Sequence, residues 1–491
     1  MAEFSWLDEL AARAPDDVLL HAPAGNWSAG EIHNELLALG ERLSGSRVVG
    51  VLADNGPAWV VADLACQTSG IVHLPLPGFF NADQLRHALE QSGADTVLTD
   101  QPERIGQLDL GFAITGRWQG LTWLRRVVDA VALPPGTAKI SFTSGSTGAP
   151  KGVCLSAAGL IDTALALRER LADLPLTRHL AVLPLALLLE NVAGVYAPLL
   201  RRMPVHLPSL STLGWAGMAG FDPAALDRAV HDTQPASLIL VPELLKAWTL
   251  FLAHSGGRPE NSLKFVAVGG ARVAPELLAT ARQAGIPAYQ GYGLTEGGSV
   301  LAINRPGDDG EGVGRPLRHA QISIESGELF VRTRAFLGYA GLPAPDGSSF
   351  PTGDLASFDA FGHLHLAGRR KNLLITSFGR NISPEWVEAG LLANPQILQA
   401  IVVGDGQAAL SAIVVPMPGS SPVAIEQAIQ RTNQQLPDYA RIAHCITSPP
   451  FTPGNGLATG NGRPQRPAII EHHRAALAAL YAQEESSHVV L

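Results

Sequence analysis

Cysteine is scarce in this chain of 491 residues. The three that are present, Cys66, Cys154 and Cys445, are odd in number and widely spaced, which indicates neither a disulfide framework nor a cysteine metal site. This usage fits a reducing compartment. Basic residues are not in excess either, because the formal net charge is -9, and this argues against a nucleic-acid-binding surface.

Long apolar runs are also missing. No window contains about 18 consecutive apolar residues, the length that a membrane-spanning helix requires. The segment 1–10 carries acidic side chains where a signal peptide needs basic ones. We therefore expect a cytoplasmic protein without a membrane span.

The chain is long and apolar enough to form more than one hydrophobic core. With 491 residues, 46% of them hydrophobic and 16% charged, it predicts a rather apolar globular protein with two or more domains. Helical periodicity alternates with short apolar runs near the start of the chain. The predicted helices span 31–43, 58–69 and 83–91, and the predicted strands span 47–53, 70–76 and 96–99. This alternation is typical of an α/β fold with parallel strand pairing.

One stretch is chemically distinctive, a glycine- and hydroxyl-rich loop between two apolar runs. It reads Ile140-Ser-Phe-Thr-Ser-Gly-Ser-Thr-Gly-Ala-Pro-Lys-Gly-Val153 and predicts a strand, a loop and a second strand. Glycines let backbone N–H groups approach an anion, hydroxyls add donors, and Lys151 adds positive charge, so the loop is suited to hold polyphosphate. It is not a Walker loop, because the lysine follows Ala-Pro and no Ser or Thr comes after it. A flexible surface linker is the alternative interpretation.

The segment 143–152 resembles the signature loop of the adenylate-forming (AMP-binding) superfamily, which includes acyl-CoA synthetases, acyl-AMP ligases and luciferase. The resemblance implies an α/β fold, with a large N-terminal domain of parallel and mixed sheets with helices and a small mobile α+β C-terminal domain. It also implies that the loop binds ATP. The loop residues expected to bind it are Thr143, Ser144, Gly145, Ser146, Thr147 and Gly148.

A second glycine-rich segment, Gly269, Gly270 and Ala271, follows a predicted strand at 264–268. Open α/β sheets bind ligands at the C-terminal ends of their strands, where glycines leave the backbone accessible. In the family that the chain resembles, this triplet lines adenine. A tight strand-to-helix turn that requires glycine is the simpler interpretation and does not exclude the first.

The motif Tyr-Gly-x-Thr-Glu supplies a third set of side chains, Tyr292, Gly293, Thr295 and Glu296. The tyrosine offers a flat face to a purine, the threonine a hydroxyl to a phosphate, and the glutamate a hard oxygen ligand for Mg²⁺. The motif follows the phosphate loop in the order that the family shows. We therefore expect Glu296 to be the metal ligand.

Two charged positions complete the expected nucleotide site. Asp354 follows a glycine turn and is suited to accept both hydroxyls of a ribose. Arg369 resembles the family's arginine at the domain joint, which touches ribose and phosphate, and Lys371 is then the hinge. The expected division is an N-terminal domain at 1–368, a hinge at 369–371 and a C-terminal domain at 372–491.

His363 and His365 alternate on one face of a predicted strand. This spacing raises the possibility of metal ligation. With no third ligand nearby in the sequence, a solvated strand face is the favoured interpretation.

The chain departs from the family pattern at two positions. Arg463 stands where the family has a lysine that reaches the substrate carboxylate, and arginine is planar and forked where lysine is a point charge. We expect Arg463 to be catalytic through a different geometry or at a lower rate, with Arg466 as the alternative. Phe378 stands where long-chain synthetases have a glycine that lines the pantetheine tunnel. Its ring disfavours free CoA as the acceptor unless Gly379 takes over that role.

The acid substrate is expected near residues 183–194. Leu187 and Asn191 replace a histidine and an arginine of long-chain acyl-CoA synthetases, and Leu187 is equally consistent with a pocket residue and with a buried helix start. Amino acid activators use an acidic residue here to hold the ammonium, but Glu190 aligns with a glutamate of fatty acyl enzymes. The run of leucines at 187–189 favours a fatty acid first and an aryl acid second.

Two functional hypotheses remain. The first is an ATP- and Mg²⁺-dependent acid–thiol ligase that forms an acyl adenylate, releases pyrophosphate and passes the acyl group to CoA or to a phosphopantetheine carrier protein. The expected catalytic residues are Lys151, Thr295, Glu296, Arg369 and Arg463. The second is a nucleotide-binding relic that works as a sensor or scaffold, and an amino acid-activating ligase is a further alternative. The expected partners are a small carboxylic acid and an acyl or peptidyl carrier protein, without nucleic acid.

Overall fold

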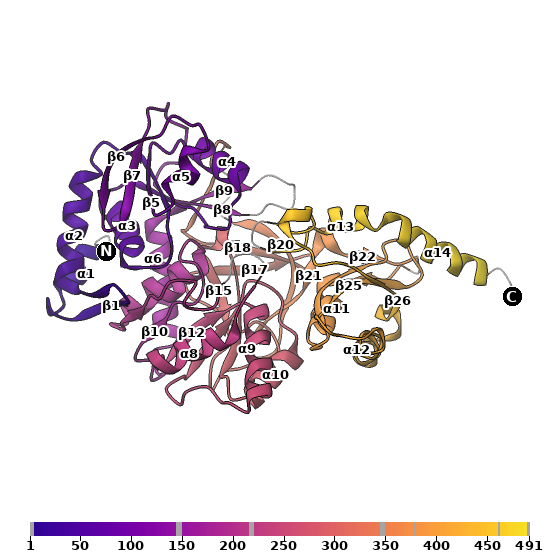
Figure 1. Ribbon diagram of the computed structural model, residues 1–491. Helices are drawn as coiled ribbons and strands as arrows, with labels where there is room; N and C mark the ends of the chain where they lie inside the picture. The colour runs from indigo at the N-terminus through magenta and orange to yellow at the C-terminus, as the bar shows by residue number, and fades with distance from the viewer. Residues whose placement is uncertain are drawn as a thin grey trace.

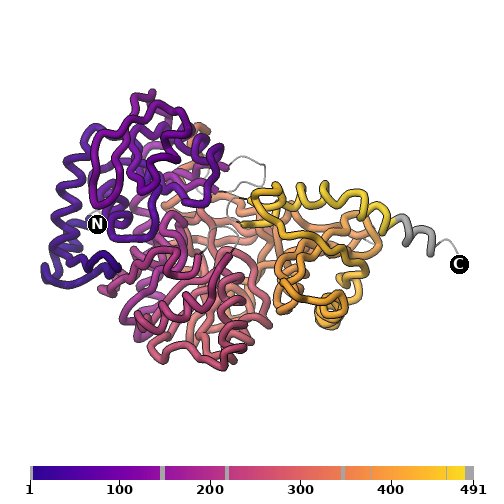
Figure 2. Tube along the Cα trace, in the orientation of Figure 1, coloured from indigo at the N-terminus to yellow at the C-terminus, as the bar shows by residue number. Residues whose placement is uncertain are grey.

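The structure is a computed structural model that describes residues 4–143, 150–215, 220–343, 349–377, 379–459 and 462–488. A large N-terminal body and a smaller C-terminal body lie side by side, and the last helix extends away from both (Figures 1 and 2). The predicted fold class, a large α/β domain followed by a small α+β domain, is confirmed. Within the described ranges, no helix is long and apolar enough to cross a membrane.

The first sheet of the large body carries the strands that flank the phosphate loop. Its strands are β3 (Val48–Leu52), β4 (Val72–Pro75), β5 (Thr96–Thr99), β6 (Ala113–Trp118), β7 (Leu121–Arg125), β8 (Thr137–Thr143), β9 (Lys151–Ser156) and β19 (Phe336–Tyr339), in the order β19-β9-β8-β4-β3-β5-β7-β6. The predicted parallel pairing is confirmed for β3 with β4 and β5, whereas β6 and β7 add an antiparallel edge. The helices at this end of the chain are α1 (Trp6–Ala11), α2 (Ala29–Arg42), α3 (Pro57–Thr68), α4 (Ala82–Ser92) and α5 (Pro102–Gly106).

The second sheet positions the glycine-rich strand ends. Its strands are β1 (Val18–Ala22), β2 (Gly25–Ser28), β10 (His179–Leu180), β11 (Val205–His206), β12 (Ser237–Leu240), β13 (Phe265–Val268), β14 (Ala288–Leu294), β15 (Ser299–Ile303) and β16 (Arg315–Pro316), in the order β16-β15-β14-β13-β12-β10-β11-β1-β2. The associated helices are α6 (Ala157–Arg170), the π-helix η1 (Glu190–Tyr196), α7 (Ala197–Leu200), α8 (Pro223–Thr233), α9 (Pro242–Ser255) and α10 (Pro275–Gln283). From β10 to β14 the pairing is parallel, so the ends of β12 and β13 open toward the same edge.

The rest of the chain forms a third sheet and the small body. The third sheet contains β17 (Gln321–Glu325), β18 (Glu328–Arg332), β20 (Phe350–Phe358) and β21 (Leu364–Arg369). The small body contains β22 (Leu374–Ile375), β23 (Asn381–Ile382), α11 (Pro384–Leu392), β24 (Ile397–Val403), β25 (Leu410–Pro416), α12 (Pro422–Gln435), β26 (Ile442–Thr447), α13 (Arg466–His472) and α14 (Arg474–His488).

The small body has its own hydrophobic core. In the described part of the chain, two clusters of buried side chains draw only on residues 374–477, one on each side of the sheet β24-β25-β26. Ala389 of α11 and the partly buried Ala393 instead pack into a cluster of the large body. The two bodies therefore have separate cores that meet along one face of α11.

A group of polar side chains is buried where the two large sheets approach each other. Asp63 of α3 lies 2.8 Å from the Lys139 ammonium of β8 and 2.7 Å from the His73 ring of β4. Asn191 and Tyr196 of η1 each donate to Asp63 Oδ2 at 2.7 Å. Burial alone would raise the pKa of Asp63, but the charges of Lys139 and His73 hold it well below its usual value.

Candidate active site

The predicted phosphate loop has the flanking strands that the sequence indicates. Strands β8 and β9 pair antiparallel, with Thr143 opposite Lys151 at the point where the loop begins and ends. The Lys151 side chain is exposed. Residues 144–148, which are expected to bind phosphate, lie outside the described residues.

Lys151 and Glu296 meet at one tyrosine ring. The Lys151 ammonium lies 5.5 Å from the ring centroid of Tyr339, and the Tyr339 hydroxyl donates to Glu296 Oε1 at 3.0 Å. Glu296 lies in the short helix η3 (Thr295–Gly297), and Tyr339 is held by the pairing of β19 with β9. Burial and the charge of Glu296 raise the pKa of Tyr339, so its hydroxyl stays a donor. The motif residue Glu296 and the loop residue Lys151 therefore lie together.

Sequence reasoning missed Tyr339 as a site residue. Its only signal is a place in a short apolar run, and the register of β19 on β9 cannot be read from that run.

Asp354 joins Tyr292 to Arg369. The Tyr292 hydroxyl donates to Asp354 Oδ2 at 2.6 Å, and Arg369 Nε donates to Oδ1 at 2.7 Å. The pairing of β20 with β21 places Asp354 opposite Arg369. Burial raises the pKa of Asp354, while the charge of Arg369 and the Tyr292 hydrogen bond act against that increase. Three of the residues that are predicted to bind the nucleotide are thus in direct contact with one another.

Two glycines of the motifs are required by their surroundings. A Cβ on Gly293 would lie 1.8 Å from the Ser299 carbonyl oxygen, so no larger residue fits. Gly270 has φ +86°, a left-handed conformation that favours glycine, and it leads from β13 into the turn at Ala271. The Gly269 amide donates to the Leu240 carbonyl at 3.2 Å, which ties the ends of β12 and β13 together.

Arg463 of the small body reaches this edge of the large body. Its guanidinium donates to the Gly270 carbonyl at 2.7 Å. The alternative, Arg466, instead donates to the Val402 carbonyl at 2.6 Å and pairs with Glu388, both in the small body. The structure therefore places Arg463, and not Arg466, at the candidate site.

The predicted hinge also lies beside the site. Lys371 lies in the short helix η4 (Arg370–Asn372), directly after Arg369, and burial and the charges of Arg369 and Lys151 lower its pKa. Phe378 lies outside the described residues, while Gly379 has φ +71° and no atom within 4 Å of an added Cβ.

The interpretation of His363 as part of a solvated strand face is wrong. Its side chain is buried, with Nε2 2.9 Å from Asp308 and Nδ1 3.1 Å from Asp359. His365 lies 3.4 Å from the same Asp359 carboxylate. Asp308 comes from the turn before β16, a tertiary pairing that strand alternation does not reveal, whereas Asp359 lies four residues before His363 in the turn before β21.

Glu190 is fully buried and hydrogen-bonded. Its Oε1 lies 3.0 Å from His179 Nε2, and its Oε2 accepts the Leu183 amide at 2.9 Å. Asn191, in the place of the family's arginine, belongs to the buried group around Asp63. Leu187 is partly buried against the cluster that surrounds α9.

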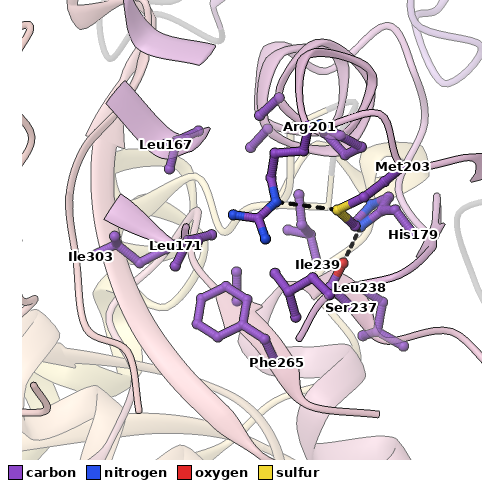
Figure 3. Close-up of a pocket in the computed structure, with 15 residues that line it drawn as sticks. Leu167, Leu171, His179, Arg201, Met203, Ser237, Leu238, Ile239, Phe265 and Ile303 are labelled. Atoms are coloured by element: carbon purple, nitrogen blue, oxygen red, sulfur yellow. Dashed lines mark hydrogen bonds between the residues drawn. The ribbon is translucent and has the colours of Figure 1, made fainter. Parts of the chain in front are cut away.

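An apolar pocket opens between α6, η1 and the strands β12 and β13 (Figure 3). Leucine, isoleucine and phenylalanine side chains are the largest group in its walls, and Ala193 and Ala267 are small residues among them. The polar lining groups are satisfied within the protein. His179 Nδ1 lies 3.0 Å from Ser237 Oγ, and Arg201 donates to two backbone carbonyls and to a methionine sulfur.

The pocket lies beside strand β13, on the N-terminal side of Gly269. Phe265 and Ala267 line it, and Gly269 is the next residue on the same face of the strand, about 7 Å further along. On the helical side, Leu189 Cδ2 lies 3.7 Å from the position of a Cβ on Gly269, and Ala193 follows about one turn later. Leu189 therefore packs against Gly269, and the small residues Ala193 and Ala267 follow on the side of the pocket.

The fold and the arrangement of the site define the class of protein. The solved structure of O-succinylbenzoate coenzyme A synthetase from Bacillus subtilis, in complex with ATP and magnesium ion, aligns with a TM-score of 0.73 at 22% identity. The alignment covers 94% of this chain and 98% of that chain. The fold is that of the adenylate-forming enzymes.

The family follows from the sequence comparisons. The model of the AMP-binding enzyme family matches residues 7–334, and that of the AMP-binding enzyme C-terminal domain matches residues 371–485. The chain therefore belongs to the AMP-binding enzyme family, and the predicted superfamily is confirmed.

Two relatives are acid–CoA ligases by name. The feruloyl-CoA synthase of Amycolatopsis sp is 30% identical over 438 residues, which cover 78% of this chain and 82% of the relative. The long-chain-fatty-acid–CoA ligase of Mycobacterium bovis is 28% identical over 453 residues, which cover 77% and 74%. The predicted enzyme class, an acid–thiol ligase, is confirmed at this level.

Proposed function

We propose that the protein uses ATP to convert an apolar carboxylic acid to its acyl adenylate and then to a thioester. In the first step a carboxylate oxygen forms a bond to the α-phosphorus, and the bond from that phosphorus to the bridging oxygen breaks to release pyrophosphate. In the second step a thiolate forms a bond to the acyl carbon, and AMP leaves. The observation that carries the proposal is the meeting of Arg463 from the small body with the Gly270 strand end.

The chain's own residues supply charge and orientation for these steps. Lys151 and Thr295 would bind the phosphates, and Asp354, which is held by Tyr292 and Arg369, would accept the ribose hydroxyls. The Glu296 carboxylate is a hard oxygen ligand of the kind that Mg²⁺ prefers, and the ion would offset phosphate charge there. Arg463 offsets the charge of the carboxylate.

The buried groups favour an acid with an apolar tail. Glu190 is committed to His179 and to the Leu183 amide, which leaves it unsuited to hold the ammonium of an amino acid. The pocket beyond Ala193 and Ala267 offers apolar walls to a tail, and burying each methylene there contributes about 0.8 kcal/mol. We propose a fatty acid as the substrate, with an aryl acid as the second candidate. One of the two relatives is named as a long-chain-fatty-acid–CoA ligase and the other as a feruloyl-CoA synthase.

The domain division belongs to the same proposal, with an N-terminal domain at 1–368, a hinge at 369–371 and a C-terminal domain at 372–491. Either CoA or a carrier-protein phosphopantetheine is the acceptor, and the ring of Phe378 favours the carrier. The separate cores of the two bodies support a small domain that moves as a unit.

A pyrophosphate-exchange assay with a panel of acids tests the function. Fatty acids should support exchange best, aryl acids less and amino acids least. Lys151→Ala should lower the rate roughly a hundredfold, as does the loss of one oxyanion donor, whereas the surface variant Lys264→Ala should leave it unchanged. Ala193→Leu should impair long acids more than short ones, because the added side chain narrows the path to the pocket.

The outcomes separate the hypotheses. No exchange with any acid, together with ATP binding by calorimetry, would identify a nucleotide-binding relic. Equal rates for wild type and Lys151→Ala would remove the loop lysine from the mechanism.

A further inference from the structure

Lys246 is a residue of the large body whose ammonium contacts the small body. It lies on α9, and its Nζ is 2.6 Å from the Leu392 carbonyl oxygen, 2.8 Å from that of Asn394 and 2.6 Å from that of Ile397. These carbonyls belong to the C-terminal end of α11 and the turn that follows. An ammonium has three N–H donors, so each donor has one acceptor.

The end of a helix is a favourable place for this charge. The last carbonyls of α11 have no partners within the helix and form the negative end of its dipole. The small residues Ala389 and Ala393 also pack against the large body. At the other end of α11, the N-cap Ser383 approaches β21 so closely that a Cβ on Gly368 would lie 2.3 Å from its Oγ. The large body therefore contacts α11 at both ends.

Helix α11 in turn holds the segment that carries Arg463. Glu388, in the middle of α11, accepts the Val402 amide at 2.7 Å and pairs with Arg466. Arg466 lies three residues after Arg463, whose guanidinium reaches the Gly270 carbonyl. A continuous set of contacts therefore runs from Lys246 through α11 to the candidate site.

We propose that Lys246 is a positioning residue that fixes α11 on the large body and so keeps Arg463 at Gly270. The inference rests on the proposed function, because Arg463 is placed in the acid-activation step. Burial lowers the pKa of Lys246 to about 8, and the charge of Glu243 on the same helix opposes this shift. At neutral pH the ammonium is mostly protonated and can use all three donors.

The test compares Lys246→Met with Lys264→Met. Methionine keeps the length of the stem and removes the charge, and Lys264 is an exposed lysine of the large body whose ammonium donates to the nearby Asn261 carbonyl. With a fatty acid, Lys246→Met should lower kcat for pyrophosphate exchange about tenfold, while KM for ATP changes less than twofold because the nucleotide contacts lie in the large body. Lys264→Met should match wild type. Equal rates for the two variants would overturn the proposal.

A double variant separates positioning from general destabilisation. In an Arg463→Ala background, Lys246→Met should cause no further loss, because the residue that it positions is gone. A tenfold loss in that background as well would show that Lys246 acts by another route and would overturn the proposal.

Limited trypsin digestion provides a readout that does not depend on activity. The segment between the bodies offers cleavage sites at Arg369, Arg370 and Lys371, and Lys246→Met should raise the rate of cleavage there several-fold over Lys264→Met. An unchanged cleavage rate would overturn the positioning role. Increased cleavage in a protein without exchange activity would support the contact between the bodies and overturn only the proposed function.

Discussion

Asp354 is a single carboxylate with both oxygens in use, one accepting from Tyr292 and the other from Arg369. Each carboxylate oxygen has a second lone-pair site, so the group can accept ribose hydroxyls and keep both partners. Its raised pKa means that protonation begins at a higher pH than for an exposed aspartate. If Asp354 binds the ribose as proposed, its charge state couples nucleotide binding to pH.

We expect ATP to bind more weakly to the wild type as the pH falls from 8 toward 5. Protonation removes the charge that holds Arg369 and one of the acceptor sites, so affinity is present above the raised pKa and is lost below it. Asp354→Asn should bind ATP roughly 10- to 100-fold more weakly at pH 8, the loss typical of a hydrogen bond to a charged group, and with less dependence on pH. Calorimetry at several pH values measures both effects, and parallel pH profiles for the two proteins would contradict the assignment.

The residues of the candidate site differ in how far the sequence could indicate them. Lys151, Glu296 and Asp354 lie in short continuous motifs, and the chemistry of such motifs can be predicted from the sequence alone. Tyr339 contributes through the register of β19 on β9, which brings its hydroxyl to Glu296. Tertiary pairing of this kind depends on the whole fold and leaves no local pattern.

At the scale of elements, strand β8 and helix η1 share the buried group around Asp63. Lys139 is on the strand that leads to the phosphate loop, and Asn191 is on the helix that leads from Glu190 toward the pocket. Lys139 donates to both Asn191 and Tyr196 and lies 2.8 Å from Asp63. These polar contacts fix the strand and the helix relative to one another.

Lys139→Met should destabilise the protein by about 3–5 kcal/mol, because it leaves the Asp63 charge buried with one cation fewer. Adding Asp63→Asn should recover part of this loss, since no uncompensated carboxylate then remains. The shift of the urea midpoint measures each variant, with exposed Lys264→Met as the control. A single variant as stable as this control would show that Asp63 does not depend on Lys139.

The sequence indicated the existence and type of many elements, and the reasons are physical. Helices α2 and α4 each bury one face, and β3, β4 and β5 are short apolar runs, so their periodicities separate them. Helix α3 is buried on all sides from Trp59 to Cys66, and its length rather than an apolar stripe distinguishes it from a strand. The segment 180–200 is apolar almost throughout, so periodicity cannot distinguish the π-helix η1 from an α-helix. The predicted helix at 31–43 instead begins at Ala29 and ends at Arg42, since helix ends are set by capping contacts, such as that of Ser28, which apolar periodicity does not show.

At the scale of the whole molecule, two cores are joined by a narrow contact. In the described part of the chain, the core clusters of the small body use residues 374–477, and the small body adds only Ala389 and Ala393 to those of the large body. A fragment of residues 1–371 should therefore fold and bind ATP, because Tyr292, Asp354 and Arg369 remain together. It should lose pyrophosphate exchange almost entirely, since Arg463 is absent.

Calorimetry and the exchange assay on this fragment check both expectations. A fragment that fails to fold would show that the two cores depend on one another. Exchange at the full rate would show that Arg463 has no part in activation of the acid.

The contact of Lys246 with α11 has a consequence for protein engineering. Its acceptors are all main-chain carbonyls, which every amino acid provides, so the contact places little demand on the sequence of the small body. A C-terminal domain transplanted from a relative would form the same three hydrogen bonds wherever its corresponding helix ended at the same place. Chimaeras between members of the family could thus replace Arg463, the arginine proposed to act in acid activation, with lysine by exchanging the whole C-terminal domain.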